Sequence, residues 1–254
     1  MLRIAALIVL LAGHANAEPW YRGDHGTNRI VHLSITAVGF VLYPATAFVE
    51  DAADHCNWCG GPNAFDRGAR DALVWSDTEA AGRLSDVVGY GVVPSLSAGL
   101  VLAGTLSEPT WAHIIDDIVP IAETMMVTQW ASRGLKLIAL RERPYSRFTD
   151  MADEDAFLSF PSAHTSWAFA TVTSAGVIAH VRGYKSEPYI WGIGIALAAA
   201  TGYFRIAADR HYLTDVLAGS VLGVSAGLTV PLLMRRTEVS VVATRTSLAV
   251  AGHW

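Results

Sequence analysis

The chain has 254 residues, which is long enough for one sizeable domain, and its formal net charge is -5. Charged residues make up 16% of the sequence and apolar residues 52%, whereas average globular proteins contain about 25% charged residues. The acidic balance, without a run of lysines, argues against a nucleic-acid-binding protein. The low charge content predicts a helical protein that is buried almost all round or lies partly in lipid.

The first 17 residues have the pattern of a secretory signal peptide. Arg3 supplies the positive start, residues 4–12 the apolar centre, and residues 15–17 (Ala-Asn-Ala) a small-x-small cleavage site. The apolar run is shorter than the roughly 20 residues that span a bilayer. We expect cleavage and export of the mature chain, with an uncleaved anchor as the alternative.

Six long apolar stretches follow, and five of them lack Asp, Glu, Lys and Arg. Their ranges are 30–49, 87–107, 114–140, 156–181, 188–204 and 216–234. The third is amphipathic and contains Glu123, Arg133 and Lys136. Gly, Ala and Ser are frequent within the stretches, as expected where helices pack closely. The sequence therefore predicts an all-α fold, a bundle of six helices.

A polar segment, residues 51–86, separates the first two stretches and predicts an exposed loop with one short helix near 65–75. It contains Cys56 and Cys59, the chain's two cysteines. A small loop disulfide fits an oxidising compartment. A zinc site needs four ligands and only His55 lies nearby, and a redox dithiol lacks its usual strand-to-helix context.

The last segment, residues 238–254, is rich in Val, Thr and Ser. Its rough alternation predicts one or two strands with a packing role. We divide the chain into a signal peptide (1–17), a helical domain (18–234) and a C-terminal tail (235–254).

Two relations to the membrane stay open. If the leader is cleaved, the new N-terminus lies outside, and three crossings place the segment after Leu140 inside the cell. An exported enzyme fits better if all six helices are extracytoplasmic, or if residues 30–49 lie against the membrane without crossing it. We retain both a membrane-associated and a soluble periplasmic protein.

The first candidate site segment joins Lys136 to Arg143-Pro144. Seven residues are close to two helical turns, so we expect Lys136 and Arg143 on one face of a helix that ends at Arg143, before the proline. A lysine point charge and an arginine fork suit a multiply charged anion. The alternative is a solvated basic face.

The second segment is Pro161-Ser162-Ala163-His164. Ser162 is a natural N-cap, so we expect a helix to begin here. A helix N-terminus offers unpaired N–H groups and a positive dipole end to an anion. His164 in the first turn is placed to donate a proton, although an ordinary capped helix explains the same residues.

The third segment is Arg205, His211 and Asp215. Residues four apart meet on a helix, so we expect Asp215 to bond one ring nitrogen of His211 and leave the other free to attack. The carboxylate would also stabilise the charged ring. A surface His–Asp pair is the alternative.

Together the three segments resemble the signature of the type 2 phosphatidic acid phosphatase and vanadium haloperoxidase superfamily. That signature has Lys and Arg-Pro, then Pro-Ser-Gly-His, then Ser-Arg, His and Asp. The resemblance spans Lys136 to Asp215 and, through the six helices, most of the mature chain. Ala163 stands where the family has Gly, and Phe204 where it has Ser.

The resemblance implies a phosphatase without a metal or other cofactor. His211 would be the nucleophile, held by Asp215, and His164 would protonate the leaving oxygen and then activate water. The phosphoryl oxygens would be bound by Lys136, Arg143, Ser162, Ala163 and Arg205.

The resemblance leaves the substrate open. A phosphorylated lipid, as monoester or pyrophosphate, is favoured by the low charge content and implies membrane association. A broad-specificity periplasmic acid phosphatase acting on small soluble phosphoesters is the main alternative. A vanadium-dependent haloperoxidase and an inactive membrane protein are further ones. The oligomeric state is not indicated.

Overall fold

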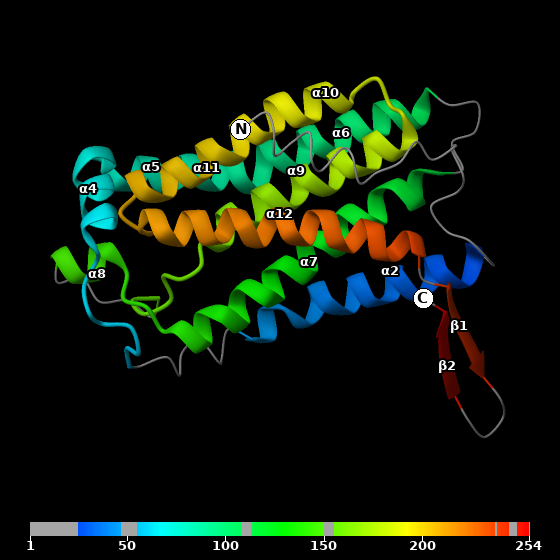
Figure 1. The fold of residues 1–254 in the computed structure, drawn as a ribbon, viewed down its shortest axis with the longest axis horizontal. Helices are drawn as coiled ribbons and strands as arrows, with labels where there is room; N and C mark the ends of the chain where they lie inside the picture. Colours follow the sequence, from blue (N-terminus) through cyan, green and yellow to red (C-terminus); the bar gives the residue numbers. More distant parts are fainter. Residues whose placement is uncertain are drawn as a thin grey trace.

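The computed structural model describes residues 25–46, 55–107, 113–149, 155–236, 238–243 and 248–253. In these residues six long helical segments lie side by side in a bundle (Figure 1). The all-α, six-helix prediction is confirmed. The six segments are α2 (His25–Leu42), α5 (Thr78–Asp86) with η2 (Val87–Val92) and α6 (Val93–Leu106), α7 (Ile114–Ala139), α9 (Ala163–Arg182), α10 (Glu187–Tyr189) with η4 (Ile190–Gly194) and α11 (Ile195–Ala207), and α12 (Leu213–Arg236).

Shorter elements cap the bundle. They are η1 (Pro44–Thr46), α4 (Ala64–Leu73), α8 (Pro144–Thr149) and the antiparallel strands β1 (Glu238–Ala243) and β2 (Leu248–His253). The short helix expected near 65–75 and the strands expected in the tail are both present. In Figure 1, α4 and α8 lie at one end of the bundle and the β1–β2 hairpin at the other. The predicted signal peptide, residues 1–17, lies outside the described residues.

Two helix boundaries differ from the sequence prediction. The second helix begins at Thr78 rather than at residue 87, because its first turns carry Glu79 and Arg83 and are therefore not part of an uncharged stretch. The fourth begins at Ala163, as the capping pattern indicates, and not at residue 156, where the uncharged stretch begins. Charge content locates a helix but does not define its ends.

The third helix ends earlier than predicted. α7 stops at Ala139, and Leu140 adopts the left-handed conformation with φ 41°. Arg143 lies in the loop that follows, directly before α8, so Lys136 and Arg143 do not share a helix face. Pro144 begins a new helix here instead of ending the previous one, in the position where proline is best tolerated.

α9 is the central helix of the bundle, and most of its side chains are buried. It packs against α12, α7, α11 and α6. The closest approach is to α12, through Gly219, Gly223 and Gly227. A Cβ atom on these glycines would lie within 3.0 Å of the backbone oxygens of Ser162, Ser166 and Ala170, respectively. Small residues at this spacing let helix backbones meet.

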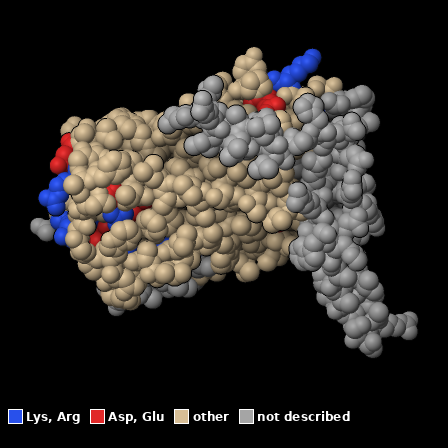
Figure 2. Space-filling model, viewed as in Figure 1, with Lys and Arg blue, Asp and Glu red and all other residues tan. Residues whose placement is uncertain are grey.

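Three of the described helical segments are long and apolar enough to cross a membrane: 78–106, 187–207 and 213–234. Figure 2 shows that, on the face in view, the middle of the bundle is almost free of charged side chains. Charged side chains gather instead near α4 and α8, and a smaller group lies near α10. These features identify a membrane-associated protein.

The segment before α4 is tied to the end of α7. Cys56 and Cys59 form a disulfide. The backbone N–H groups of Asn57 and Trp58 both donate to the oxygen of Leu140, at 3.1 and 3.4 Å. This segment therefore covers the same end of the bundle as α8.

Candidate active site

A polar cavity of about 160 Å³ opens at the end of the bundle that carries α4 and α8. Six of the predicted site residues line it, and they come from all three sequence segments: Lys136, Arg143, Ala163, His164, Arg205 and His211. Five residues that the sequence analysis did not select complete the lining: Tyr43, Tyr90, Gln129, Arg133 and Asp155. Ser162 and Asp215 are fully buried and are not among the lining residues.

Two arginines present their guanidinium groups to the cavity from fixed positions. Arg143 donates from Nε to the backbone oxygen of Asp155 at 2.8 Å and from Nη1 to that of Arg210 at 3.3 Å. Arg205, in the last turn of α11, donates from Nη1 to Ser85 Oγ at 3.1 Å. Its buried Nε has no hydrogen-bond partner among the described residues. Unused donors of this kind favour a bound anion.

The imidazole of His211 is held by a backbone carbonyl. Nδ1 lies 2.7 Å from the oxygen of Ser159 and 3.8 Å from Oδ2 of Asp215. A direct Asp215 bond was predicted from helical spacing, but His211 lies in the turn before α12 begins at Leu213. A donating Nδ1–H leaves the lone pair of Nε2 free. The ring is therefore in the tautomer that a nucleophile needs.

Asp215 supports His211 indirectly. Its Oδ2 accepts from the Ser159 hydroxyl at 2.6 Å and from the backbone N–H of Tyr212 at 2.9 Å. The carboxylate thus fixes both the residue that binds the ring and the residue that follows His211. Ser159 was missed from sequence, where it lies three residues before the predicted cap and carries no recognisable signal.

Arg141 links Asp215 to the segment that covers the site. It donates to Asp215 Oδ1 at 2.5 Å and to Asp66 Oδ2 at 2.7 Å, and its guanidinium stacks over the ring of Trp58 at 4.2 Å. Asp66 in turn accepts from the backbone N–H of Thr214 at 2.8 Å. A buried arginine with two carboxylates is fully paired, and removal of one partner is costly.

His164 is held by two groups on the neighbouring helical segment. Its Nε2 lies 2.7 Å from Asp86 Oδ1, and the ring of Tyr90 lies 4.3 Å from its own. Asp86 is also 3.9 Å from Arg205. Asp86 ends α5 and Tyr90 lies in η2, so neither could be connected to the site from sequence spacing alone.

Burial lowers the pKa of His211 well below its usual value, and the nearby charges of Arg143 and Arg205 lower it further. The ring is therefore neutral at physiological pH. Burial alone would raise the pKa of Asp155, but the charges of Arg143 and Lys136 hold it below the ordinary value. Asp155 is ionised and contacts Arg143 Nη2 at 3.3 Å.

The two departures from the sequence signature have different surroundings. Ala163 lines the cavity as the first residue of α9. Phe204 is not among the lining residues, and its ring packs edge-on against Trp75, with centroids 5.8 Å apart. In the described residues no group of three or more His, Cys, Asp or Glu side chains is placed to hold a metal ion.

Comparison with known proteins finds a matching family and a similar sequence. Residues 117–238 match the PAP2 superfamily. A segment of 75 residues is 36% identical to a lipid A 1-phosphatase from Porphyromonas gingivalis. That segment is 30% of this chain and only 16% of the relative's length.

Two solved structures are similar in fold. A transmembrane PAP2 type phosphatidylglycerolphosphate phosphatase from Bacillus subtilis aligns over 77% of this chain and 93% of its own, with 20% identity and a TM-score of 0.50. LpxE from Aquifex aeolicus aligns over 64% of this chain and 90% of its own, with 22% identity and a TM-score of 0.45.

Proposed function

We propose that the chain, which belongs to the PAP2 superfamily through residues 117–238, hydrolyses the phosphate monoester or pyrophosphate of a lipid through a phosphohistidine. The arrangement of His211 carries this proposal. Its ring is buried and neutral, its Nδ1 is bonded to Ser159, and it borders a cavity that Lys136 and Arg205 also line. A neutral imidazole of fixed tautomer beside anchored cations is suited to attack on phosphorus.

The reaction then has two steps. In the first, Nε2 of His211 bonds to phosphorus, the bond to the leaving oxygen breaks, and His164 donates a proton to that oxygen. Burial lowers the pKa of His164 to about 3. The negative charges of Asp86 and of the substrate phosphate oppose this shift and favour the protonated ring that the step needs. In the second, His164 takes a proton from water, the water oxygen attacks phosphorus, and the phosphorus–nitrogen bond breaks. Asp86, 2.7 Å from His164, holds the ring for both transfers.

The cations take the place that a metal occupies in other phosphoryl transfer sites. Lys136 reaches the cavity from α7, Arg143 from the loop before α8 and Arg205 from α11, so an anion in the cavity would meet cations from three separate segments. Positive groups fixed in advance stabilise the charge of the transferring phosphoryl group. We therefore expect activity to persist in EDTA.

A lipid substrate is supported by three apolar helical segments and by the name of the matched relative, a lipid A 1-phosphatase. The cavity lies at the end of the bundle, where a headgroup would meet it at the membrane surface. Soluble phosphomonoesters remain the alternative, and a side-by-side assay separates the two.

The test uses the purified chain in detergent with EDTA present. Para-nitrophenyl phosphate, phosphatidate and a polyprenyl pyrophosphate are compared for the wild type, His211→Ala and His180→Ala. His180 is the matched control, because it pairs with Glu187 near the C-terminal end of α9, whereas the site lies at the N-terminal end. We expect lipid hydrolysis by the wild type and the control and none by His211→Ala. Equal activity in His211→Ala would contradict the mechanism.

Export is a proposal that rests on the leader pattern of residues 1–17. If the leader places His25 outside the cytoplasm and all six helices cross the membrane, the cavity faces the cytoplasm. The reason is that α2 runs from His25 toward the cavity end of the bundle (Figure 1). Protease treatment of vesicles prepared in both orientations shows on which side of the membrane the 55–77 segment lies. Extraction by alkaline carbonate would contradict an integral protein.

A further inference from the structure

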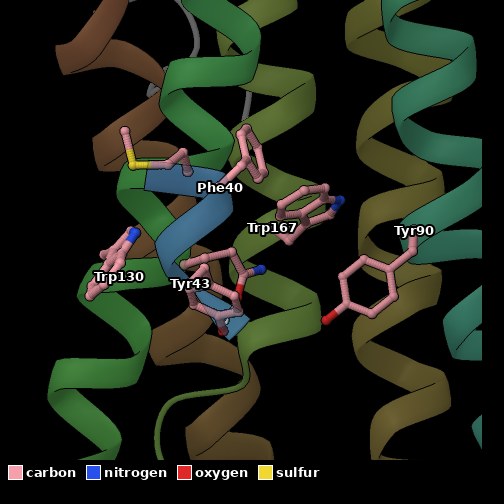
Figure 3. Close-up of a pocket in the computed structure, with 7 residues that line it drawn as sticks. Phe40, Tyr43, Tyr90, Trp130 and Trp167 are labelled. Atoms are coloured by element: carbon pink, nitrogen blue, oxygen red, sulfur yellow. Dashed lines mark hydrogen bonds between the residues drawn. The ribbon is translucent and has the colours of Figure 1, made fainter. Parts of the chain in front are cut away.

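A second cavity, of about 230 Å³, adjoins the polar one. The two share Tyr43, Tyr90 and Gln129 as lining residues. The second is otherwise lined by Phe40, Met126, Trp130 and Trp167, and we call it the aromatic chamber. Figure 3 shows the labelled rings, which come from α2 and the turn after it, η2, α7 and α9.

The chamber walls are preassembled by ring contacts. Phe40 and Tyr90 each pack edge-on against Trp167, with centroids 6.4 and 5.5 Å apart. Tyr43 packs edge-on against Trp130 at 6.0 Å. Edge-on pairs are a favourable aromatic geometry, and the Met126 thioether adapts to irregular apolar shapes. The chamber therefore offers an apolar surface that needs no rearrangement to receive a hydrocarbon.

One unpaired donor lies where the two cavities meet. Gln129 is only 6% exposed, and its Oε1 accepts from the Tyr43 hydroxyl at 3.2 Å. Its Nε2 is buried and has no hydrogen-bond partner among the described residues. An unpaired buried amide is costly, so this position favours a ligand with an acceptor oxygen between its phosphate and its apolar part.

We propose that the aromatic chamber binds the start of a single hydrocarbon chain joined directly to the phosphate or diphosphate, as in a prenyl or alkyl phosphate. This inference rests on the proposed function and specifies its substrate class. In such a substrate the phosphate lies in the polar cavity, the ester oxygen accepts from Gln129, and the chain begins at once among the rings of Phe40, Trp130 and Trp167.

Size and polarity favour one chain over two. Pockets for drug-sized ligands measure about 300–1,000 Å³, and the chamber, at about 230 Å³, is smaller. A glycerol-linked diacyl phosphate would bring two chains and two ester carbonyls to the same place. Among the described residues that line the chamber, Gln129 Nε2 and Trp167 Nε1 are the buried donors without a partner, and a carbonyl placed away from them among aromatic rings loses its hydration without compensation.

The experiment compares farnesyl phosphate, didecanoyl phosphatidate and glycerol 3-phosphate in the same detergent micelles. The variant is Phe40→Ala, whose ring is 38% exposed and lines the chamber but not the polar cavity. The matched control is Phe65→Ala, on α4, with a ring that is 60% exposed and lines neither cavity. Inhibition by orthovanadate, which has no chain, reports on the phosphate site alone.

We expect the wild type to use farnesyl phosphate with at least tenfold higher kcat/KM than the other two substrates. Phe40→Ala should raise the KM for farnesyl phosphate about tenfold, as expected for the loss of an apolar contact with the bound chain, and change the vanadate inhibition constant less than twofold. A second variant, Gln129→Leu, should lower kcat/KM for farnesyl phosphate more than it weakens vanadate binding.

Several results would overturn the inference. One is a preference for didecanoyl phosphatidate, and another is equal KM values for farnesyl phosphate in Phe40→Ala and Phe65→Ala. In both cases the proposed phosphatase function still stands. A wild type that hydrolyses none of the substrates, nor para-nitrophenyl phosphate, would instead remove the proposed function itself.

Discussion

Ser159 contacts the proposed nucleophile His211 through its backbone and the carboxylate Asp215 through its side chain. Its carbonyl oxygen lies 2.7 Å from His211 Nδ1, and its hydroxyl lies 2.6 Å from Asp215 Oδ2. The expected histidine–aspartate pair is therefore a relay of three residues. The carboxylate orients the imidazole by fixing the loop that binds it.

Ser159→Ala tests this relay. The carbonyl that binds His211 remains, but the hydroxyl bond to Asp215 is lost, so we expect kcat to fall roughly 10- to 100-fold, the cost typical of lost outer-shell partners. The KM should change little. Ser220→Ala is the matched control, because that hydroxyl bonds only the backbone of Val216 in its own helix. Unchanged kcat in Ser159→Ala would mean that the carbonyl alone is sufficient.

Asp86→Asn tests the support of His164. The amide keeps the shape of the side chain but removes the charge that faces the imidazole at 2.7 Å. We expect kcat to fall about 10- to 100-fold, within the range of general acid–base effects. Glu79→Gln, on the same helix but on its exposed side, is the control. If both variants keep wild-type turnover, His164 acts without Asp86.

The lowered pKa of His211 predicts how stability depends on pH. The unfolded chain binds a proton at this residue below its ordinary pKa of about 6.5, whereas the folded chain does not. Stability is therefore fully present above about pH 6.5 and is lost as the pH falls toward the lowered folded pKa, by up to about 1.4 kcal/mol per pH unit. Thermal unfolding in detergent between pH 5 and 7 measures this slope. His211→Asn should make the slope shallower, and an identical slope in both proteins would contradict the assignment.

The glycine contact between α9 and α12 predicts a large effect of one methyl group. Gly223→Ala places a Cβ against the Ser166 oxygen and the Phe169 side chain, so we expect a loss of roughly 1–3 kcal/mol from overpacking. Gly99→Ala in α6 has open space around the new Cβ and should be neutral or stabilising by about 0.5–1 kcal/mol. Unfolding midpoints of the two variants provide the comparison. Equal midpoints would show that the helices separate without cost.

The fold was predictable because its helices are long, apolar and interrupted by charged or proline-containing segments. Ser162 marked the start of α9, and the alternation in the tail marked its strands. The prediction failed at two helix boundaries: α5 begins among polar and charged residues at Thr78, and α7 ends where Leu140 adopts the left-handed conformation. Backbone conformation at those positions depends on tertiary contacts, such as the bonds that Leu140 accepts from Asn57 and Trp58.

The cationic and imidazole residues of the site were predictable because residue type and spacing identify them. Their supports were not. Asp86, Ser159 and Arg141 reach the site from separate parts of the chain, and no periodicity connects them to the residues they hold. The assumption that spacing of four implies a helix also failed for His211, because α12 begins two residues later.

If the bundle crosses a bilayer, the close contact of α9 with α12 has a consequence for how the protein responds to bilayer thickness. Helices adjust to a thicker or thinner bilayer by changing their tilt. Two helices that meet backbone to backbone along Gly219, Gly223 and Gly227 tilt as one body, so His164 on α9 and His211, just before α12, keep their separation. α2 packs mainly on α7 and carries the Phe40 wall of the chamber. We therefore expect a change in bilayer thickness to alter substrate affinity more than turnover.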